Sequence, residues 1–272
     1  MVIQGVTAIV TGAAGGIGKA VCIELAKRGA ATVVLVDRSD GVTSLAHSIS
    51  EFSEGATRAI PYVGDVTDED FRKRVFAEVH SNGEPPRICV PAAGAVYDML
   101  AARVDKQTGQ AVLYPSEQFR RLIDVDLTAP VYWALEMVAH IAEHRHARGL
   151  GRWTPAEHVQ GTVIFIGSVS SQGNRGQIAY AAAKAGLAGA AATLTKEAMF
   201  HGVRCGVIHP GFTDTSMVRN LGQQYVDERI LPQTQLGRLI RPEEIADAVC
   251  FMVANSAVSG QLWADAGWHP SA

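Results

Sequence analysis

Residues 11–18 read Thr11-Gly12-Ala13-Ala14-Gly15-Gly16-Ile17-Gly18, and this glycine-rich run decides the fold. A strand-like apolar segment, Val6 to Val10, precedes it, and a segment with helical periodicity, Lys19 to Arg28, follows it. Glycines between a strand and a helix allow a tight turn and a close approach of the backbone to a pyrophosphate, which the helix start attracts. A plain turn between packed elements is the alternative. The run predicts a dinucleotide site at Gly12, Gly16, Ile17 and Gly18.

Length and composition bound the class of protein. The chain has 272 residues, of which 47% are hydrophobic and 19% charged, and its formal net charge is −3. One globular α/β domain with a sizeable core fits these values. No Lys/Arg stripe is visible, so nucleic acid is not an expected partner. No run approaches the roughly 18 apolar residues of a membrane span, so no membrane contact is expected.

The cysteines and the first residues predict where the protein works. Four cysteines, Cys22, Cys89, Cys205 and Cys250, stand far apart in apolar runs, which is typical of buried free thiols in a reducing compartment. The first residues enter a strand without the basic and apolar pattern of a secretion signal. We therefore expect a cytoplasmic protein.

Strand-like and helix-like segments alternate along the chain. The further strand-like segments are Ala31 to Asp37, Thr57 to Val63, Arg87 to Val90, Thr162 to Gly167, Val203 to Ile208 and Gln261 to Asp265. Helical stretches include Glu69 to His80, Ser116 to His146, Ile178 to Phe200 and Pro242 to Ala254. Continuous apolar strands separated by helices are typical of a parallel sheet. The sequence predicts an α/β fold, a single Rossmann-type doubly wound domain over residues 1–272, with a seven-stranded parallel sheet and helices on both faces.

Two polar segments interrupt this alternation, residues 103–115 and residues 145–160. The first follows the carboxyl end of a strand, where ligands bind in such sheets, so we expect it to line the mouth of the pocket. The second follows a helix and lies on the opposite edge of the sheet, which favours a surface or interface feature.

Asp37 ends the second strand, about 20 residues past the glycine run. Its carboxylate can accept hydrogen bonds from the ribose hydroxyls of an adenosine and repels a 2′-phosphate, which favours NAD(H) over NADP(H). The next residue, Arg38, could pair with that phosphate, so NADP(H) stays possible. A solvated loop acid is the alternative interpretation of Asp37.

Tyr180 and Lys184 stand at positions i and i+4 of a predicted helix, so both side chains lie on one face. A free tyrosine titrates near 10 and is a poor base at neutral pH. A neighbouring ammonium favours the phenolate, and the pair can then serve general acid/base chemistry. The alternative is a surface lysine beside a half-buried tyrosine.

These motifs together resemble the short-chain dehydrogenase/reductase family, and the resemblance covers essentially the whole chain. The glycine run has the family's spacing, Thr-Gly-x-x-x-Gly-x-Gly, and Tyr180-Ala181-Ala182-Ala183-Lys184 carries its Tyr-x-x-x-Lys motif. Asp65, Ser168, Pro210-Gly211-Phe212-Thr213 and Asp265-Ala266-Gly267 follow in the family's order. The chain is most similar to 3-oxoacyl-thioester reductases.

The resemblance implies an oxidoreductase that transfers a hydride between NAD(H) and a secondary alcohol or ketone. It implies that Tyr180 moves the proton, that Lys184 binds the nicotinamide ribose and lowers the tyrosine pKa, and that Ser168 hydrogen-bonds the substrate oxygen. Ser170 and Ser171 are fallback candidates for that serine. Further cofactor contacts are implied for Asp65, Val66, Ala93, Gly94, Pro210, Gly211 and Thr213.

Two departures from the family's pattern stand out. Asp126 occupies the place of an asparagine that holds a proton-relaying water in the family. A carboxylate there could hold the same water or pair directly with Lys184, and direct pairing would raise the pKa of Tyr180 and shift the pH optimum to alkaline values. Pro91-Ala92 replaces the usual Asn-Asn before Ala93-Gly94, which predicts a local loss of polar contacts without loss of the nucleotide.

Several alternatives stay open at the level of the sequence. The substrate could be a 3-oxoacyl thioester, a cyclic or aromatic alcohol, or a sugar or polyol. The departures at Asp126 and Pro91-Ala92 also allow a catalytically impaired, NAD-binding regulator. In the resembled family the region of residues 213–236 forms a mobile substrate lid, and its apolar members favour an acyl-type substrate here. These members are Met217, Val218, Leu221, Tyr225 and Ile230.

The remaining signals concern metals and subunits. His140, His144 and His146 cluster at a helix end with His158 nearby, but no zinc motif surrounds them, so we expect a solvated helix end and no metal. Trp263, Trp268 and His269 stand near the end of the sequence. Such aromatics pack at subunit contacts in the resembled family, which implies a homo-oligomer, either a tetramer or a dimer.

Overall fold

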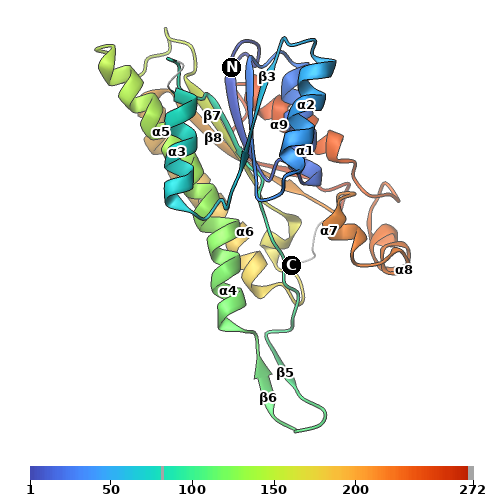
Figure 1. The fold of residues 1–272 in the computed structure, drawn as a ribbon. Helices are drawn as coiled ribbons and strands as arrows, with labels where there is room; N and C mark the ends of the chain where they lie inside the picture. The colour runs from blue at the N-terminus through green and yellow to red at the C-terminus, as the bar shows by residue number, and fades with distance from the viewer. Residues whose placement is uncertain (81–82, 269–272) are drawn as a thin grey trace.

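Seven parallel strands form one sheet in the computed structural model, which describes residues 1–80 and 83–268 (Figure 1). The strands are β1 (Thr7–Thr11), β2 (Thr32–Asp37), β3 (Arg58–Val63), β4 (Ile88–Pro91), β7 (Gly161–Ile166), β8 (Val203–Pro210) and β9 (Gly260–Ala264). Their order is β3-β2-β1-β4-β7-β8-β9, and the predicted parallel sheet is confirmed. The order reverses between β1 and β4, and at such a switch point the strand ends leave a crevice for a ligand.

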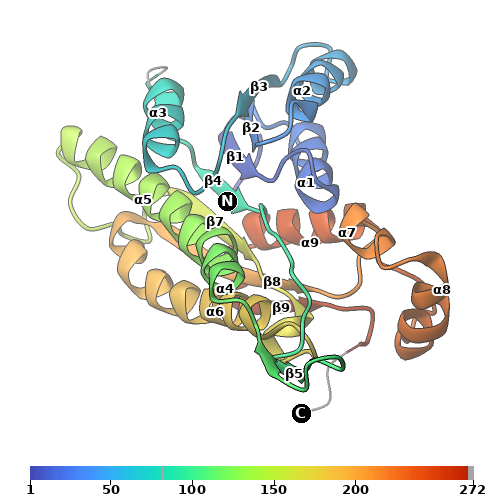
Figure 2. The ribbon, with the colours of Figure 1, turned by 60° about the horizontal axis from the view of Figure 1, so that its bottom comes forward.

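Helices cover both faces of the sheet (Figure 2). One face carries α1 (Gly16–Lys27), α2 (Gly41–Phe52) and α9 (Pro242–Ala254), and the other carries α3 (Glu69–His80), α5 (Ala129–Ala147) and α6 (Ile178–Glu197). Strand β2 shows how the sequence builds two cores at once. Val33 and Leu35 pack in one cluster and Val34 and Val36 in the other, because successive side chains of a strand point to opposite faces.

The predicted helix from Ser116 to His146 contains an unexpected turn. It consists of α4 (Ser116–Ile123), a π-helical segment η1 (Asp124–Thr128) and α5. Extra residues of this kind inside an α-helix are frequent at functional sites. Here the π-helical segment carries Asp126, which is completely buried. Periodicity along a sequence does not reveal such a turn, because the apolar pattern continues across it.

The first polar segment forms a hairpin of β5 (Ala102–Val104) and β6 (Ala111–Leu113). The hairpin projects beyond α4 (Figure 1). Its two strands pair with each other, and the Asp105 carboxylate closes the turn by accepting from the Gln107 and Thr108 N–H groups at 2.9 and 2.8 Å. None of residues 103–115 lines the cleft at the carboxyl ends of the strands, which is described below. The expectation that this segment lines the mouth of the pocket is therefore wrong.

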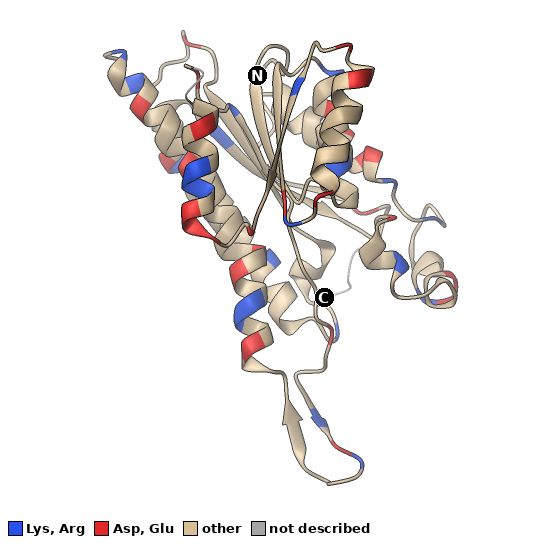
Figure 3. Ribbon diagram, viewed as in Figure 1, with Lys and Arg blue, Asp and Glu red and all other residues tan. Residues whose placement is uncertain are grey.

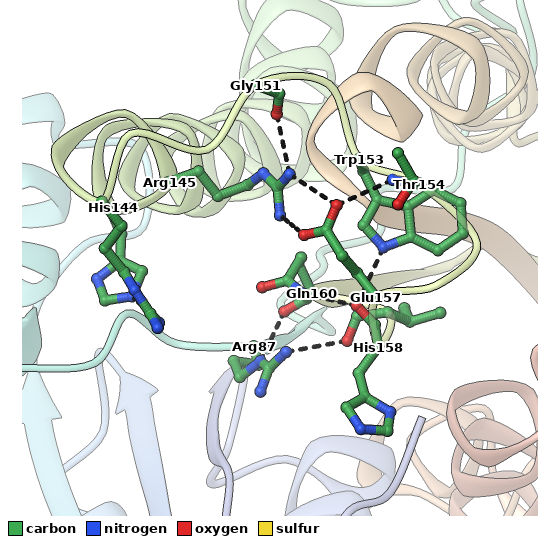
Figure 4. A network of polar contacts seen from close by, with 11 residues as sticks. Arg87, His144, Arg145, Gly151, Trp153, Thr154, Glu157, His158 and Gln160 are labelled. Atoms are coloured by element: carbon green, nitrogen blue, oxygen red, sulfur yellow. Dashed lines mark hydrogen bonds and ion pairs between the residues drawn. The ribbon is translucent and has the colours of Figure 1, made fainter.

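The second polar segment is fixed to the amino-terminal edge of the sheet by a network around Arg145 (Figure 4). The Arg145 guanidinium is almost fully buried, binds the Glu157 carboxylate at 2.6 Å and donates to the Gly151 carbonyl at 2.9 Å. Arg87 donates to the Gln160 carbonyl at 2.8 Å from the start of β4. A buried charge is stable only when it is paired in this way. The segment therefore stabilises the edge of the sheet opposite the carboxyl ends of the strands.

The region between β8 and α9 is built from short turns. It contains α7 (Ser216–Arg219), α8 (Gln223–Tyr225), η4 (Val226–Ile230) and η5 (Leu231–Gln233). Trp268 contacts this region in two ways. Its indole donates to the Gln233 side chain at 2.8 Å, and its ring packs edge-on against Phe212. Trp263 stacks on His209 within the same chain. These two tryptophans thus pack inside their own subunit, and His269 lies outside the described residues.

The surface and the cysteines agree with the composition. Charges of both signs are interspersed along α3, α4 and α5 (Figure 3). All four cysteines are buried free thiols. None of the helices within residues 1–80 and 83–268 is long and apolar enough to span a bilayer.

We expect Arg145→Ala to lower the free energy of unfolding by about 3 kcal/mol, because it removes a buried side chain that holds the Glu157 carboxylate and the Gly151 carbonyl and leaves a cavity. Urea denaturation followed by circular dichroism measures the change. Arg148→Ala, one turn away on an exposed position, should change the same quantity by less than about 0.5 kcal/mol. Equal effects of the two variants would show that the network contributes no stability.

Candidate active site

A long cleft of about 820 Å³ runs along the carboxyl ends of β1, β2, β3, β4, β7 and β8. It is lined by every predicted site residue except Asp126. These residues are Gly12, Gly16, Ile17, Gly18, Asp37, Asp65, Val66, Ala93, Gly94, Ser168, Tyr180, Lys184, Pro210, Gly211 and Thr213. The fold therefore brings together side chains that are far apart in the sequence, because parallel strands end at one edge of the sheet.

The glycine run forms a close-packed cradle at one end of the cleft. Gly12 has φ +67°, and a Cβ atom there would lie 2.6 Å from the Ala93 nitrogen of the neighbouring strand end. A Cβ atom at Gly18 would lie 2.2 Å from the Gly12 carbonyl oxygen. Helix α1 begins at Gly16, earlier than the predicted Lys19, so its free N–H groups face this cradle. Such a cradle fits the pyrophosphate of a dinucleotide.

Asp37 sits at the end of β2 and is held in the cleft by two main-chain groups. Its Oδ2 accepts from the Ala14 N–H and its Oδ1 from the Ser39 N–H, both at 3.0 Å. The carboxylate therefore links the glycine run to the strand end beside the cradle. Arg38 is exposed and lines the cleft as well.

Asp65 lies after β3 at the same end of the cleft. It accepts from the Thr67 N–H at 2.9 Å and from the Thr67 hydroxyl at 2.7 Å. These hydrogen bonds lower the pKa of the Asp65 carboxyl, with a smaller effect from the nearby Arg38 and Arg121. The oriented carboxylate and the following Val66 backbone can meet an adenine ring, as the sequence resemblance implies.

The predicted catalytic side chains meet at the middle of the cleft. Ser168 follows β7, and its Oγ accepts from the Ser170 N–H at 3.1 Å. Tyr180 and Lys184 come from the first turns of α6, and the Lys184 Nζ lies 5.5 Å from the centre of the Tyr180 ring. Burial raises the pKa of Tyr180, whereas the Lys184 charge and the hydrogen bond to Ser168 lower it.

Lys184 is buried and pairs directly with Asp126. Its Nζ lies 3.2 Å from the Asp126 Oδ1 and donates to the Ile166 carbonyl at 3.1 Å. Burial alone would lower the pKa of Lys184, but the Asp126 charge, the Tyr180 charge and the hydrogen bond to Asp126 together raise it. The pairing also raises the pKa of Tyr180. Of the two arrangements that the sequence allowed, the structure has the direct pair.

The residues around Asp126 explain how the pair fits. The Ala95 N–H donates to the Asp126 Oδ1 at 3.2 Å. A Cβ atom at Gly94 would lie 2.8 Å from the same oxygen, so only glycine leaves room there. Pro91-Ala92 lacks the amides usual in the resembled family, but the Ala93 N–H still donates to the Thr11 hydroxyl at 3.3 Å. The backbone after β4 thus keeps its place.

Apolar and polar side chains outside the glycine cradle also line the cleft. Met217, Val218 and Leu221 line it from the predicted lid, whereas Ile230 is buried in packing. Three further residues, which the sequence motifs did not indicate, also line the cleft: Asp98, Asn174 and Gln177. The Gln177 amide connects the other two side chains by hydrogen bonds. Its nitrogen donates to the Asp98 Oδ1 at 3.0 Å, and its oxygen accepts from the Asn174 side chain at 3.1 Å. For Asn174 and Gln177 the available signal was their position between Ser168 and Tyr180 in the sequence, whereas nothing near Asp98 pointed to the site.

The histidines form no metal centre in the part of the chain that the structure describes. His140 and His144 are half-buried rather than solvated, which corrects the expectation of an exposed helix end. The reason is His80 on α3, whose Nδ1 lies 2.8 Å from the His140 Nδ1. His158 instead belongs to the loop around Trp153 (Figure 4).

Known proteins share this sequence pattern and fold. The sequence profile described as short chain dehydrogenase matches residues 6–226. The chain is 30% identical over 257 residues to the 3-oxoacyl-(acyl-carrier-protein) reductase FabG of Escherichia coli, covering 93% of this chain and 92% of that protein. It is 31% identical over 270 residues to the cis-4-hydroxycyclohexanecarboxylate dehydrogenase of Sinomonas cyclohexanicum, covering 96% and 95%. The crystal structure of 3-hydroxyacyl-CoA dehydrogenase type-2 from Mycobacterium avium aligns with a TM-score of 0.82 and 26% identity, over 98% of this chain and 97% of that one.

We expect Gly94→Ala to lower the free energy of unfolding by about 1–3 kcal/mol, because the new methyl group overlaps a buried carboxylate oxygen that cannot move away. Thermal and urea unfolding measure the effect. Gly189→Ala is the matched control, since nothing lies within 4 Å of a Cβ atom at this exposed helical position. That control should raise stability by up to about 1 kcal/mol. A neutral Gly94→Ala would contradict the tight fit around Asp126.

Proposed function

This chain belongs to the short-chain dehydrogenase family and is an NAD(P)-dependent oxidoreductase of alcohol and ketone substrates, and we propose that it transfers a hydride between NAD(H) and a secondary alcohol or ketone. One observation carries the proposal. Ser168, Tyr180 and Lys184 lie in the same cleft as the glycine cradle. The intact catalytic group favours an enzyme over an impaired regulator.

The proposed chemistry follows from the positions of the side chains. NAD(H), when bound, supplies or accepts the hydride. In reduction, the electron pair of the carbonyl double bond moves to oxygen, which takes the proton of the Tyr180 hydroxyl. Ser168 donates a hydrogen bond to the same oxygen while its own Oγ accepts from the Ser170 N–H. The Lys184 ammonium stabilises the Tyr180 phenolate that remains, and alcohol oxidation runs the same steps in reverse.

Asp37 supports NAD(H) as the preferred cofactor. Both of its carboxylate oxygens are oriented by main-chain N–H groups beside the glycine run. A fixed negative charge at this place can accept from ribose hydroxyls and repels a 2′-phosphate. Arg38 lines the same end of the cleft and leaves NADP(H) as the weaker alternative.

Apolar residues of the lid support an acyl-type substrate. Met217, Val218 and Leu221 line the cleft, and the Escherichia coli relative is a 3-oxoacyl reductase by name. We therefore place 3-oxoacyl thioesters first among the substrates. The similarity to a cis-4-hydroxycyclohexanecarboxylate dehydrogenase supports a cyclic alcohol as the second candidate. The polar residues Asp98 and Gln177 support a sugar or polyol as a third.

We also propose that the protein forms a homo-oligomer and works in the cytoplasm. Tyr132 and Leu135 on the outer side of α5 are 49% and 40% exposed, an apolar pair that a second subunit could cover in a dimer or tetramer. The free, buried thiols of all four cysteines support a cytoplasmic location, because the cytoplasm keeps thiols reduced.

Turnover of NADH or NADPH with ketones and 3-oxoacyl thioesters tests the function directly. We expect turnover with NADH that exceeds turnover with NADPH about tenfold or more, because Asp37 repels the extra phosphate. Tyr180→Phe should reduce kcat at least about a hundredfold, since it removes the proton donor. Tyr62→Phe, a half-buried tyrosine on β3 outside the cleft, is the matched control and should stay active. Binding of NADH without any turnover in the wild type would favour the regulator.

The pH dependence tests the role of Asp126. Burial raises the pKa of Tyr180 and the Asp126 charge raises it further. Alcohol oxidation needs the phenolate, so wild-type kcat/KM should rise with pH into the alkaline range. Asp126→Asn removes the negative charge, lowers the tyrosine pKa and should move this rise to lower pH by about one unit. Asp70→Asn, exposed on α3, is the control of equal charge change, and an unmoved profile in Asp126→Asn would refute the role.

A further inference from the structure

A buried histidine lies directly beneath the loop that carries Ser168. His209 is the last residue but one of β8, and it is 0% exposed. Its ring stacks on the Trp263 ring of β9, with ring centres 4.2 Å apart and planes 15° apart. A Cβ atom at Gly167 would lie 2.6 Å from the His209 Nδ1, so glycine at this position lets the ring approach the backbone of β7.

The two ring nitrogens of His209 face different partners. Nδ1 lies 3.3 Å from the Ser168 nitrogen, 3.1 Å from the Ser168 carbonyl oxygen and 3.3 Å from the Ser171 Oγ. Nε2 lies 2.8 Å from the Gln261 Oε1 on β9. The ring therefore touches both main-chain polar groups of Ser168, and none of its contacts is to the substrate side of the cleft.

The charge and the tautomer of the ring together decide which of these contacts can form. A neutral imidazole has one N–H donor and one acceptor nitrogen. With the Gln261 carbonyl oxygen as acceptor, Nε2 carries the hydrogen and Nδ1 accepts from the Ser168 N–H and the Ser171 hydroxyl. A protonated ring donates from both nitrogens, so Nδ1 then binds the Ser168 carbonyl and the Ser168 N–H loses its acceptor.

The surroundings of His209 favour the neutral ring at neutral pH. Burial lowers its pKa, the hydrogen bonds to Ser168 and Gln261 oppose this, and the Lys184 ammonium lowers it further. The groups that face the ring are Lys184 from α6, the two serines after β7, and Gln261 and Trp263 from β9. Lys184 is the charged member of this set.

We propose that His209 is a positioning residue for Ser168: its neutral ring holds the Ser168 peptide in place, and protonation of the ring releases the Ser168 N–H and lowers turnover. The inference rests on the proposed carbonyl reduction, in which the Ser168 hydroxyl must meet the substrate oxygen. A displacement of about 1 Å of a catalytic group can reduce the rate about a hundredfold. The histidine acts through Ser168 and does not touch the reacting atoms.

Steady-state kinetics of NADH-dependent ketone reduction test the proposal first. Wild-type kcat should fall at acidic pH, below the ordinary range of a histidine, because burial lowers the pKa of the His209 ring. His209→Asn keeps a polar side chain that does not titrate, so the acidic fall should disappear. Its kcat at pH 7 should be about tenfold lower, with KM for NADH changed less than about twofold. His47→Asn, exposed on α2, should keep the wild-type profile.

A second variant keeps the ring and changes only its charge balance. Gln261 is exposed, so Gln261→Glu places a carboxylate against Nε2 without burying a charge. The acidic fall of kcat should then move up by about one pH unit, because the carboxylate favours the protonated ring. Gln107→Glu in the β5–β6 turn makes the same charge change on an exposed residue outside the cleft and should not move it. An unmoved fall in Gln261→Glu overturns the proposal, whether or not His209→Asn folds.

Backbone NMR gives a readout that needs no turnover. In ¹⁵N-labelled protein the Ser168 amide signal should titrate with the same midpoint as the His209 ring, and this titration should vanish in His209→Asn. A Ser168 signal that ignores the ring titration overturns the inference. If the wild type binds NADH but reduces no carbonyl, the proposed function fails, and the amide titration still decides whether His209 controls Ser168.

Discussion

A buried ammonium needs a counter-charge, and this requirement organises the centre of the molecule. Lys184 finds its counter-charge in Asp126 at 3.2 Å, with both side chains almost completely removed from solvent. Either charge alone in this place would cost several kcal/mol, on the order of 3–5. The pair connects α6 with the π-helical segment η1 and, through the Ala95 N–H, with the loop after β4. The two charges of the pair also act on the pKa of Tyr180, which Lys184 lowers and Asp126 raises.

The cleft separates two kinds of recognition along its length. One end combines glycines, the start of α1 and the oriented carboxylates of Asp37 and Asp65, which suits a dinucleotide. Apolar lid residues and the hydrogen-bonded pair of Asp98 and Gln177 line other parts of the cleft, which suits a substrate. The catalytic side chains stand between them. This division follows from the parallel sheet, because all strands deliver their carboxyl ends to the same edge.

Both groups proposed to handle the substrate oxygen rest on buried ionisable residues. Tyr180 depends on the Lys184–Asp126 pair, and Ser168 depends on His209 beneath its peptide. Burial gives these supports well-defined positions, and it also makes them sensitive to a single proton. The two polar segments play no part in this arrangement. One extends outward as a hairpin, and the other is fixed around Arg145 at the opposite edge of the sheet.

Local patterns in the sequence determined the parallel sheet, the glycine cradle and the Tyr180–Lys184 pair, because periodicity and i,i+4 spacing act within a few residues. The departure at Asp126 was visible as well, but the choice between a water and a direct pair was not. The π-helical segment, the outward course of the hairpin, the His80–His140 contact and the place of His209 under Ser168 were decided by the tertiary structure alone. The physical reason is that each depends on which distant elements the folded sheet brings into contact, and no local pattern records that.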